Sequence, residues 1–263
     1  MIVGITGSTG TIGNILKQKL LLQHAELEEF NGDIRNIKDI KNWYRNDFDA
    51  IFHLAAVVPI IEVNNNPLTA YNVNVGGTIN LLEIVTKNRN KPWLFYASSA
   101  HVYKSKNAAI KEEDVIEPIS LYGETKWMAE RVCIETAKAY NIPFCCGRIF
   151  SFFHKTQKKP FLFPTIVERL ENEDLDKPFK LFGAESVRDF LNAESVVNII
   201  LKLYEKKYQG TVNIASGKGI KICDFVQNIS EKKLNIKPVG DKFDYLVADV
   251  NRLISIIGEE IES

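Results

Sequence analysis

The sequence of 263 residues predicts an α/β protein in which helices cover both faces of a doubly wound parallel sheet. Two observations lead to this fold class. Short apolar runs, typical of buried strands, alternate along the chain with segments of helical periodicity. The first strand also runs directly into a glycine-rich turn and a helix, within the stretch MIVGITGSTGTIG at residues 1–13.

The expected elements follow one another in order. Strands are expected at residues Ile2–Ile5, Leu27–Phe30, Ala50–Ala55, Trp93–Ala97, Phe144–Ile149 and Thr211–Ala215. A first helix is indicated by Ile12, Leu16 and Leu20 at helical spacing. Further helices are expected at Asn36–Arg45, Pro67–Lys87, Tyr122–Tyr140, Pro164–Leu170, Glu194–Lys206 and Lys221–Leu234.

The glycines of the first turn match a dinucleotide-binding fingerprint. Gly7 would permit the tight turn that leaves the strand, Gly10 would let backbone N–H groups approach a pyrophosphate, and Gly13 would let the helix pack closely. A helix N-terminus binds phosphate through its free N–H groups and partial positive charge. An ordinary strand–helix turn rich in glycine is the alternative, but the strand–turn–helix setting favours cofactor binding.

Composition narrows the possible functions. Lys plus Arg and Asp plus Glu both total 33, so no net charge attracts the chain to nucleic acid or to an acidic membrane. The run Ala50–Ile61 falls short of the roughly 20 apolar residues that a membrane span requires. We expect no signal peptide, because the first residues already form the fingerprint strand. The four cysteines show no metal-ligand spacing, which favours reduced thiols, no metal and a cytoplasmic enzyme.

A tyrosine and a lysine four residues apart carry the expected chemistry. On a helix, Tyr122 and Lys126 share one face, and a nearby cation favours the phenolate that a proton acceptor must form. Ser98 and Ser99 follow the strand Trp93–Ala97, at the edge where ligands meet a parallel sheet. Singly these side chains would be a surface pair and a helix cap; together, behind a dinucleotide fingerprint, they indicate a redox site.

The choice between NAD and NADP stays open in the sequence. An acidic residue about 20 positions after the fingerprint normally binds the ribose 2′-hydroxyl and selects NAD. Only eighteen residues separate Gly13 from Gly32. Glu28, Glu29 and Asp33 are candidates for this role, and Arg35 is a possible partner of a 2′-phosphate.

The chain resembles the extended short-chain dehydrogenase/reductase family, which includes nucleotide-sugar epimerases, dehydratases and reductases. The matching segments are Thr6-Gly7-x-x-Gly10-x-x-Gly13, Gly32-Asp33-Ile34-Arg35, His53-Leu54-Ala55-Ala56, Asn74-Val75-x-Gly77-Thr78, Ser98-Ser99-Ala100-His101-Val102-Tyr103, Tyr122-x-x-x-Lys126, Arg188-Asp189-Phe190 and Asn213-Ile214-Ala215-Ser216-Gly217. They cover the chain nearly end to end. They are specific for the family and say little about the substrate.

The resemblance implies roles for individual residues. NAD, with NADP as the alternative, would be bound by Gly7, Thr9, Gly10, Thr11, Ile12, Gly13, Asp33, Ile34, Leu54, Ala55, Ala56, Asn74, Ser98, Tyr122 and Lys126. The catalytic residues would be Ser99, Tyr122 and Lys126. The nucleotide-sugar substrate would contact Ser99, Ala100, His101, Ser151 and Arg188.

The resemblance also implies an organisation. A Rossmann-type domain would span residues 1–149 and be joined by segments near 189–217. A small substrate lobe would comprise residues 154–188 and 218–263. Helices Pro67–Lys87 and Tyr122–Tyr140 would pair across a homodimer.

Departures from the family pattern bear on the reaction. Lys104, Ser151, His154 and Ser195 stand at positions where the family usually has other residues. The 4,6-dehydratases carry an Asp-Glu pair after the catalytic hydroxyl, whereas Ser99 is followed by Ala100 and His101. Because alanine transfers no proton, we expect no dehydration unless His101 substitutes alone. The Ser-Ser-Ala segment favours a C4 epimerase, with a 4-keto-sugar reductase as the alternative. A non-catalytic NAD(P)-binding sensor is the rival from another class.

Overall fold

The computed structural model describes residues 1–241, 243–258 and 261. Its centre is a six-stranded parallel sheet with the strand order β2-β1-β3-β4-β5-β9. The strands are β1 Ile2–Thr6, β2 Glu26–Phe30, β3 Ala50–His53, β4 Trp93–Ser99, β5 Phe144–Ile149 and β9 Gly210–Ile214. This confirms the predicted fold class. The order reverses between β1 and β3, and ligands of such sheets bind beyond the carboxyl ends of the strands at this point.

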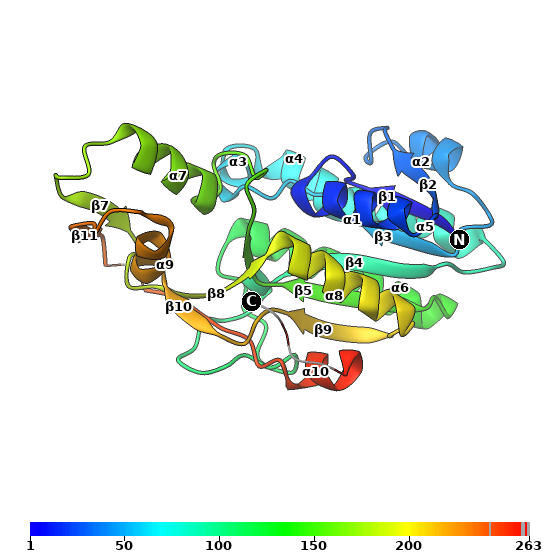
Figure 1. Cartoon of the computed structure of the whole chain (residues 1–263). Helices are drawn as coiled ribbons and strands as arrows, with labels where there is room; N and C mark the ends of the chain where they lie inside the picture. Colours follow the sequence, from blue (N-terminus) through cyan, green and yellow to red (C-terminus); the bar gives the residue numbers. More distant parts are fainter. Residues whose placement is uncertain (242, 259–260, 262–263) are drawn as a thin grey trace.

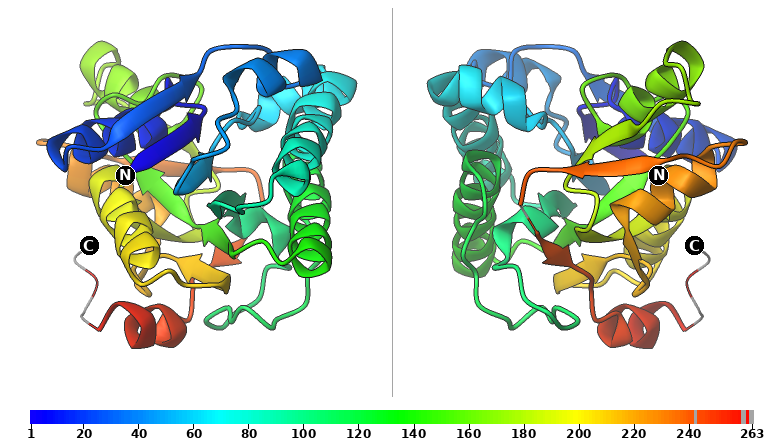
Figure 2. Two further views of the ribbon diagram at one scale, coloured as in Figure 1. Left: turned by 90° about the vertical axis from the view of Figure 1, so that its right-hand side faces the viewer. Right: turned by 90° about the vertical axis from the view of Figure 1, so that its left-hand side faces the viewer.

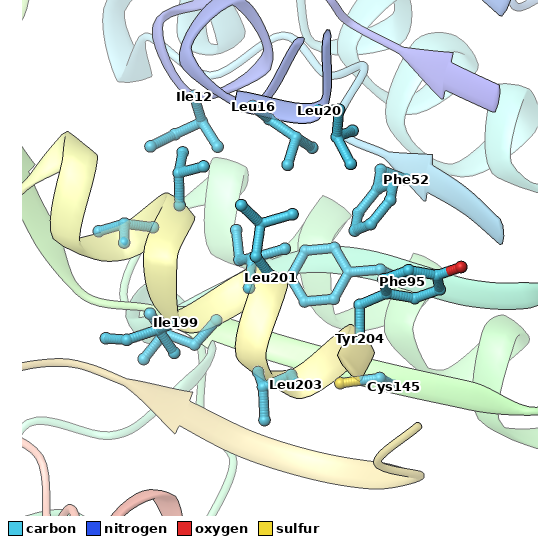
Figure 3. Packing of buried hydrophobic residues seen from close by; sticks show 14 of the residues in the cluster. Ile12, Leu16, Leu20, Phe52, Phe95, Cys145, Ile199, Leu201, Leu203 and Tyr204 are labelled. Carbon is cyan, nitrogen blue, oxygen red and sulfur yellow. The ribbon is translucent and has the colours of Figure 1, made fainter. Parts of the chain in front are cut away.

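Helices cover both faces of this sheet, as Figure 1 shows. They are α1 Thr11–Leu22, α2 Ile37–Trp43, α3 Ile60–Asn65, α4 Pro67–Tyr71, α5 Gly77–Lys87, α6 Leu121–Tyr140, α7 Leu162–Asn172, α8 Ala193–Glu205, α9 Ile222–Ile229 and α10 Asn251–Ile257. On one face, α1 and α8 pack on the sheet: Leu16 and Leu20 lie across from Leu201 and Tyr204, close to Phe52 (Figure 3). The other face is covered by α2, α5 and α6.

The expected single helix Pro67–Lys87 is divided. A π-helical turn, η1 Asn72–Gly76, separates α4 from α5. The wide turn brings Asn74 into the interior, where its amide bonds the backbone of Val57. Beyond the turn, Gly77 lies so close to Ile34 that a Cβ atom would come within 2.6 Å of its side chain.

A smaller lobe lies at the left of Figure 1, away from the N-terminus. Its strands and those that connect it to the main sheet are β6 Ser151–Phe153, β7 Phe179–Phe182, β8 Val187–Asn192, β10 Gly219–Lys221, β11 Ile236–Val239 and β12 Tyr245–Leu246. β8 pairs with β6, β10 and β12, whereas β7 pairs with β11. α7, α9, β7 and β11 share one apolar cluster.

The boundaries of this lobe differ in part from the expected segments. α9 ends at Ile229 rather than Leu234, because the charged run 231–233 supplies no apolar face and the Gln227 side chain accepts the Leu234 N–H at 2.9 Å. α10 packs on β9 and α8 of the main layer. Within the expected range 218–263, residues 242, 259–260 and 262–263 lie outside the described part of the chain. The division into two domains stays a prediction.

Candidate active site

The glycine turn after β1 forms a cradle that only glycine backbones permit. Gly7 has a φ of +76°, and a Cβ atom there would lie 2.6 Å from the Ala55 nitrogen. A Cβ at Gly13 would lie 2.2 Å from the Gly7 oxygen. At Gly10 a Cβ would meet only that same oxygen, at 3.4 Å, so the space above Gly10 is open.

Gly10 also begins α1 without a side-chain cap, and no acidic residue lies in the first turn of that helix. Its first N–H groups therefore face the open space above Gly10, as a pyrophosphate requires. Thr9 and Thr11 flank this position, and Ile12 packs into the core beneath it. The residues present thus fit the dinucleotide that the fingerprint predicts.

A buried histidine supports the next strand beside this cradle. Thr78 donates to the Asn74 carbonyl oxygen at 2.7 Å and therefore accepts from His53 Nε2 at 2.8 Å. His53 Nδ1 then accepts from the Thr6 hydroxyl at 2.7 Å. Burial, reinforced by the charge of Lys126, lowers the pKa of His53 to about 3. The neutral ring thus fixes β3 against β1, and Leu54, Ala55 and Ala56 follow it at the carboxyl edge.

His53 should make the protein sensitive to mild acid. Below pH 6.5 the unfolded chain protonates this imidazole, whereas the folded chain does so only near pH 3. The free energy of unfolding should therefore fall as the pH decreases from about 6.5, by up to about 1.4 kcal/mol per pH unit from this residue. Urea unfolding at several pH values between 7 and 4.5 measures this dependence. The free energy of unfolding of His53→Asn should decrease with falling pH along a shallower slope than that of the wild type. The exposed His24→Asn is the control and should keep the wild-type slope; equal slopes for His53→Asn would refute the assignment.

The candidate catalytic residues meet at the carboxyl end of β4. Ser99 ends that strand, and Tyr122 lies in the first turn of α6. The Ser99 hydroxyl lies near enough to the Tyr122 phenol to lower its pKa. Gly123 makes this approach possible, because a Cβ there would lie 2.2 Å from the His101 carbonyl oxygen. The Ser120 hydroxyl caps the same helix by accepting from the Gly123 N–H at 3.1 Å.

The pKa values of Tyr122 and Lys126 differ from the expectation. Burial raises the pKa of Tyr122 to about 12, and the hydrogen bond from Ser99 offsets only part of that rise. Burial also lowers the pKa of Lys126 to about 8, and its ammonium lies 4.3 Å from the ring centre of Tyr96. The expected lowering of the Tyr122 pKa by Lys126 is not observed, and burial is the largest influence on this phenol. At neutral pH Tyr122 is a phenol, ready to donate a proton.

Comparison with known proteins decides the family. The family model described as GDP-mannose 4,6 dehydratase matches residues 5–249. The chain belongs to this family. That assignment confirms the resemblance to the extended short-chain dehydrogenase/reductases.

Curated relatives of this family carry several activities in their names. The GDP-6-deoxy-D-talose 4-dehydrogenase of Aggregatibacter actinomycetemcomitans is 28% identical, across 97% of this chain and 91% of the relative. The UDP-glucose 4-epimerase of Lactobacillus helveticus is 27% identical, across 87% of this chain and 77% of the relative. Among solved structures, RMD from Pseudomonas aeruginosa complexed with NADPH has a TM-score of 0.89 at 22% identity and covers all of this chain and 92% of that one.

The residues expected to contact the substrate have different surroundings in the structure. Ala100 is only 3% exposed and packs in a buried cluster, which leaves its backbone alone for a ligand. The ring of His101 meets that of Tyr122 edge-on, with centroids 5.7 Å apart. Ser151 begins β6 opposite Phe190 of β8. Arg188 Nη2 contacts Asp244 Oδ2 at 3.1 Å, and burial lowers the pKa of this arginine.

Several of the residues expected to bind the cofactor are hydrogen-bonded to, or packed against, other parts of the protein. The amide of Asn74 accepts from the Val57 N–H at 2.7 Å and donates to the Thr125 hydroxyl at 2.9 Å, so it positions the backbone after β3. The Ser98 hydroxyl donates to Glu130 Oε2 at 2.6 Å rather than standing free for a cofactor. Ile34 lies against α5 at Gly77. His154, whose role the sequence left open, shares a 2.7 Å hydrogen bond with Thr156 through Nδ1.

Glu130 and Arg148 form a buried ion pair beside Ser98 that the sequence did not indicate. Glu130 on α6 is fully buried and accepts from Arg148 Nε of β5 at 3.0 Å. Arg148 Nη1 in turn donates to the Tyr103 hydroxyl at 2.7 Å. Glu130 follows Lys126 by four residues, so the spacing that brought Tyr122 and Lys126 together also reaches Glu130. In the described residues, no cluster of His, Cys, Asp and Glu side chains could hold a metal ion.

Proposed function

We propose that the chain is an NAD(P)-dependent enzyme that acts on a nucleotide-linked sugar, as an epimerase at C4. The observation that carries this proposal is the placement of Ser99 at the carboxyl end of β4 near Tyr122, with Lys126 one turn along the same helix. The bound nicotinamide would accept or supply the hydride. The names of curated relatives, among them UDP-glucose 4-epimerase and GDP-6-deoxy-D-mannose reductase, support the substrate class.

The residues of the chain would manage the proton. Ser99 would hold the sugar oxygen beside the Tyr122 oxygen. As a phenolate, Tyr122 would take the proton of an alcohol, and as a phenol it would return that proton to a ketone. The Ser99 hydroxyl lowers the pKa of Tyr122 and so favours the phenolate in the oxidising half of the cycle. Lys126 would bind the nicotinamide ribose, as the family resemblance implies.

Dehydration, although it names the family model, does not suit these residues. Elimination of water needs an additional acid and base beside the catalytic hydroxyl. Ala100, which follows Ser99, is buried and has no proton to transfer. We therefore do not assign dehydratase activity to this chain.

A 4-keto-sugar reductase is the second candidate, and the raised pKa of Tyr122 favours it. A phenol with a pKa of about 12 is protonated at neutral pH, as the donor to a ketone must be. The reductase would use the same residues as the epimerase. The two differ in whether the hydride returns to the sugar within one cycle.

Cofactor stoichiometry tests the proposal. Purified protein is mixed with UDP-, dTDP- and GDP-linked sugars and their 4-keto derivatives, and the absorbance of NAD(P)H is followed beside chromatography of the sugars. An epimerase should convert sugar with no net change in NAD(P)H. Oxidation of one NAD(P)H per sugar would assign the reductase instead. Tight cofactor binding without turnover across the panel would revive the non-catalytic sensor.

We also propose a homodimer that forms through α4, α5 and α6, and a cytoplasmic location. α5 and α6 lie side by side on one flank of the molecule (Figure 2). Large apolar side chains are exposed on these three helices at Leu68, Ile79, Leu121 and Met128. Sedimentation velocity at micromolar concentration should show a dimer, and a single monomeric species would refute it.

The four cysteines are free thiols, three of them buried, as in a reducing compartment. Among the described residues, no helix is long and apolar enough to cross a bilayer.

A further inference from the structure

The carboxyl end of β2 is where an enzyme of this fold distinguishes NADH from NADPH. The two cofactors differ only by the 2′-phosphate on the adenosine ribose, and a carboxylate at this point normally selects NADH. β2 pairs with β1 so that Phe30 lies opposite Thr6. Asn31 therefore follows the strand at the level of Gly7, where the glycine turn begins. Asn31 is exposed and neutral, and its amide nitrogen donates to the Glu29 carbonyl oxygen at 3.3 Å.

Each of the three carboxylates that the sequence offered for this role is already paired with a cation. Glu28 contacts Arg45 Nη1 at 2.9 Å. Glu29 contacts Lys17 Nζ at 3.1 Å and also bonds the Ser8 hydroxyl.

The third carboxylate, Asp33, turns toward its own neighbour. Arg35 contacts it through two atoms, Nε at 2.9 Å and Nη2 at 2.6 Å. These bonds hold the pKa of Asp33 at about 2.

The three carboxylates that the sequence offered are thus compensated. A fourth, Asp39, lies against Gly32. It accepts from the Asp33 N–H and the Asn36 amide, both at 2.9 Å. The residue at the expected position, Asn31, carries no charge.

The same edge holds a guanidinium that is suited to phosphate. The side chain of Arg35 is half exposed, and its Nη1 takes no part in the bonds to Asp33. Its backbone is fixed against α5, because Asn80 donates to the carbonyl oxygens of Ile34 and Arg35 at 3.2 and 3.0 Å. A planar guanidinium can bind a carboxylate along one edge and offer its remaining N–H groups to a phosphate.

We propose that this end of the site selects NADPH over NADH. Asn31 accommodates the 2′-phosphate without charge repulsion, and Arg35, still paired with Asp33, donates to that phosphate through Nη1. The proposal rests on the proposed function only in that a dinucleotide binds at the glycine turn. It concerns the adenosine end alone and is independent of the sugar and of the reaction type.

Binding measurements without any sugar test the proposal. The full chain is titrated calorimetrically with NADPH and with NADH, and we expect NADPH to bind at least about tenfold more tightly. Arg35→Gln should weaken NADPH binding about tenfold and leave NADH binding unchanged. Asn31→Asp should reverse the preference, because it places the selecting carboxylate beside the ribose. Arg169→Gln is the matched control: it removes an arginine of α7 that likewise contacts one carboxylate, Glu173, through Nε and Nη2, and it should change neither affinity.

The outcomes separate this inference from the proposed function. Equal or tighter binding of NADH by the wild type would overturn the selectivity and leave the proposed function standing. An equal loss of both affinities in Arg35→Gln would also overturn it, since a structural role of Arg35 would act on both cofactors. Binding of neither nucleotide would overturn both proposals.

Discussion

Replacing Tyr122 with phenylalanine should lower kcat by about 10²- to 10⁴-fold, the range that a positioned acid–base group contributes. Phenylalanine keeps the ring that meets His101 edge-on and loses only the hydroxyl that bonds Ser99. The fold and the glycine cradle are untouched, so the Kd of the cofactor should stay within about twofold. Steady-state kinetics and calorimetric titration of the same preparation measure the two quantities.

Tyr140→Phe is the matched control for this variant. Tyr140 ends the same helix and is 53% exposed, so its hydroxyl should contribute nothing to turnover. Retention of more than about a tenth of the wild-type kcat in Tyr122→Phe would exclude this residue as the proton carrier. A large loss of cofactor affinity in that variant would instead show that the hydroxyl serves binding.

Glu130→Gln should be the most destabilising of the conservative substitutions, at about 3–5 kcal/mol in the free energy of unfolding. The carboxylate is fully buried, and the side chain of Arg148 is only 5% exposed. Glutamine keeps the size of the side chain but leaves the guanidinium charge buried without its counterion. The Ser98 hydroxyl also loses its charged acceptor, next to Ser99. Urea unfolding at neutral pH measures the change.

Two further variants make this result interpretable. Glu135→Gln on the exposed side of the same helix should stay within about 0.5 kcal/mol of the wild type. The double substitution Glu130→Leu with Arg148→Met should recover much of the loss, because it removes both buried charges. A loss below about 1 kcal/mol in Glu130→Gln would contradict the pairing seen in the structure.

Features with a local sequence signal were predictable, and features that depend on distant contacts were not. Five strands of the main sheet were located because each is a short apolar or β-rich run, whereas β2, with the sequence ELEEF, offers only Leu27 and Phe30. Tyr122 and Lys126 were located because four residues make about one helical turn. The pair Glu130 and Arg148 was missed because its members lie on different elements, eighteen residues apart.

The same distinction explains which details were missed. The expected helix 67–87 is helical throughout, but its π-helical turn escaped prediction because it depends on the contact of Asn74 with Val57, seventeen residues away. The bond between Ser98 and Glu130 was missed because the sequence does not place Glu130 nearby. The short strands of the lobe, such as β12 with two residues, form only through pairing with β8.

The π-helical turn at Asn72–Gly76 also constrains how the length of this region can change in evolution. Such a turn is in effect an α-helix with one residue inserted. Loss of one residue there would restore regular winding and leave α4 and α5 nearly in phase, because five residues of a π turn cover about the same rotation as four of an α-helix. Leu68, which is 78% exposed, would keep its direction. Asn74, in contrast, would no longer be pushed inward to reach Val57. A single-codon deletion in this turn should therefore spare the helix and remove the contact that positions the backbone after β3.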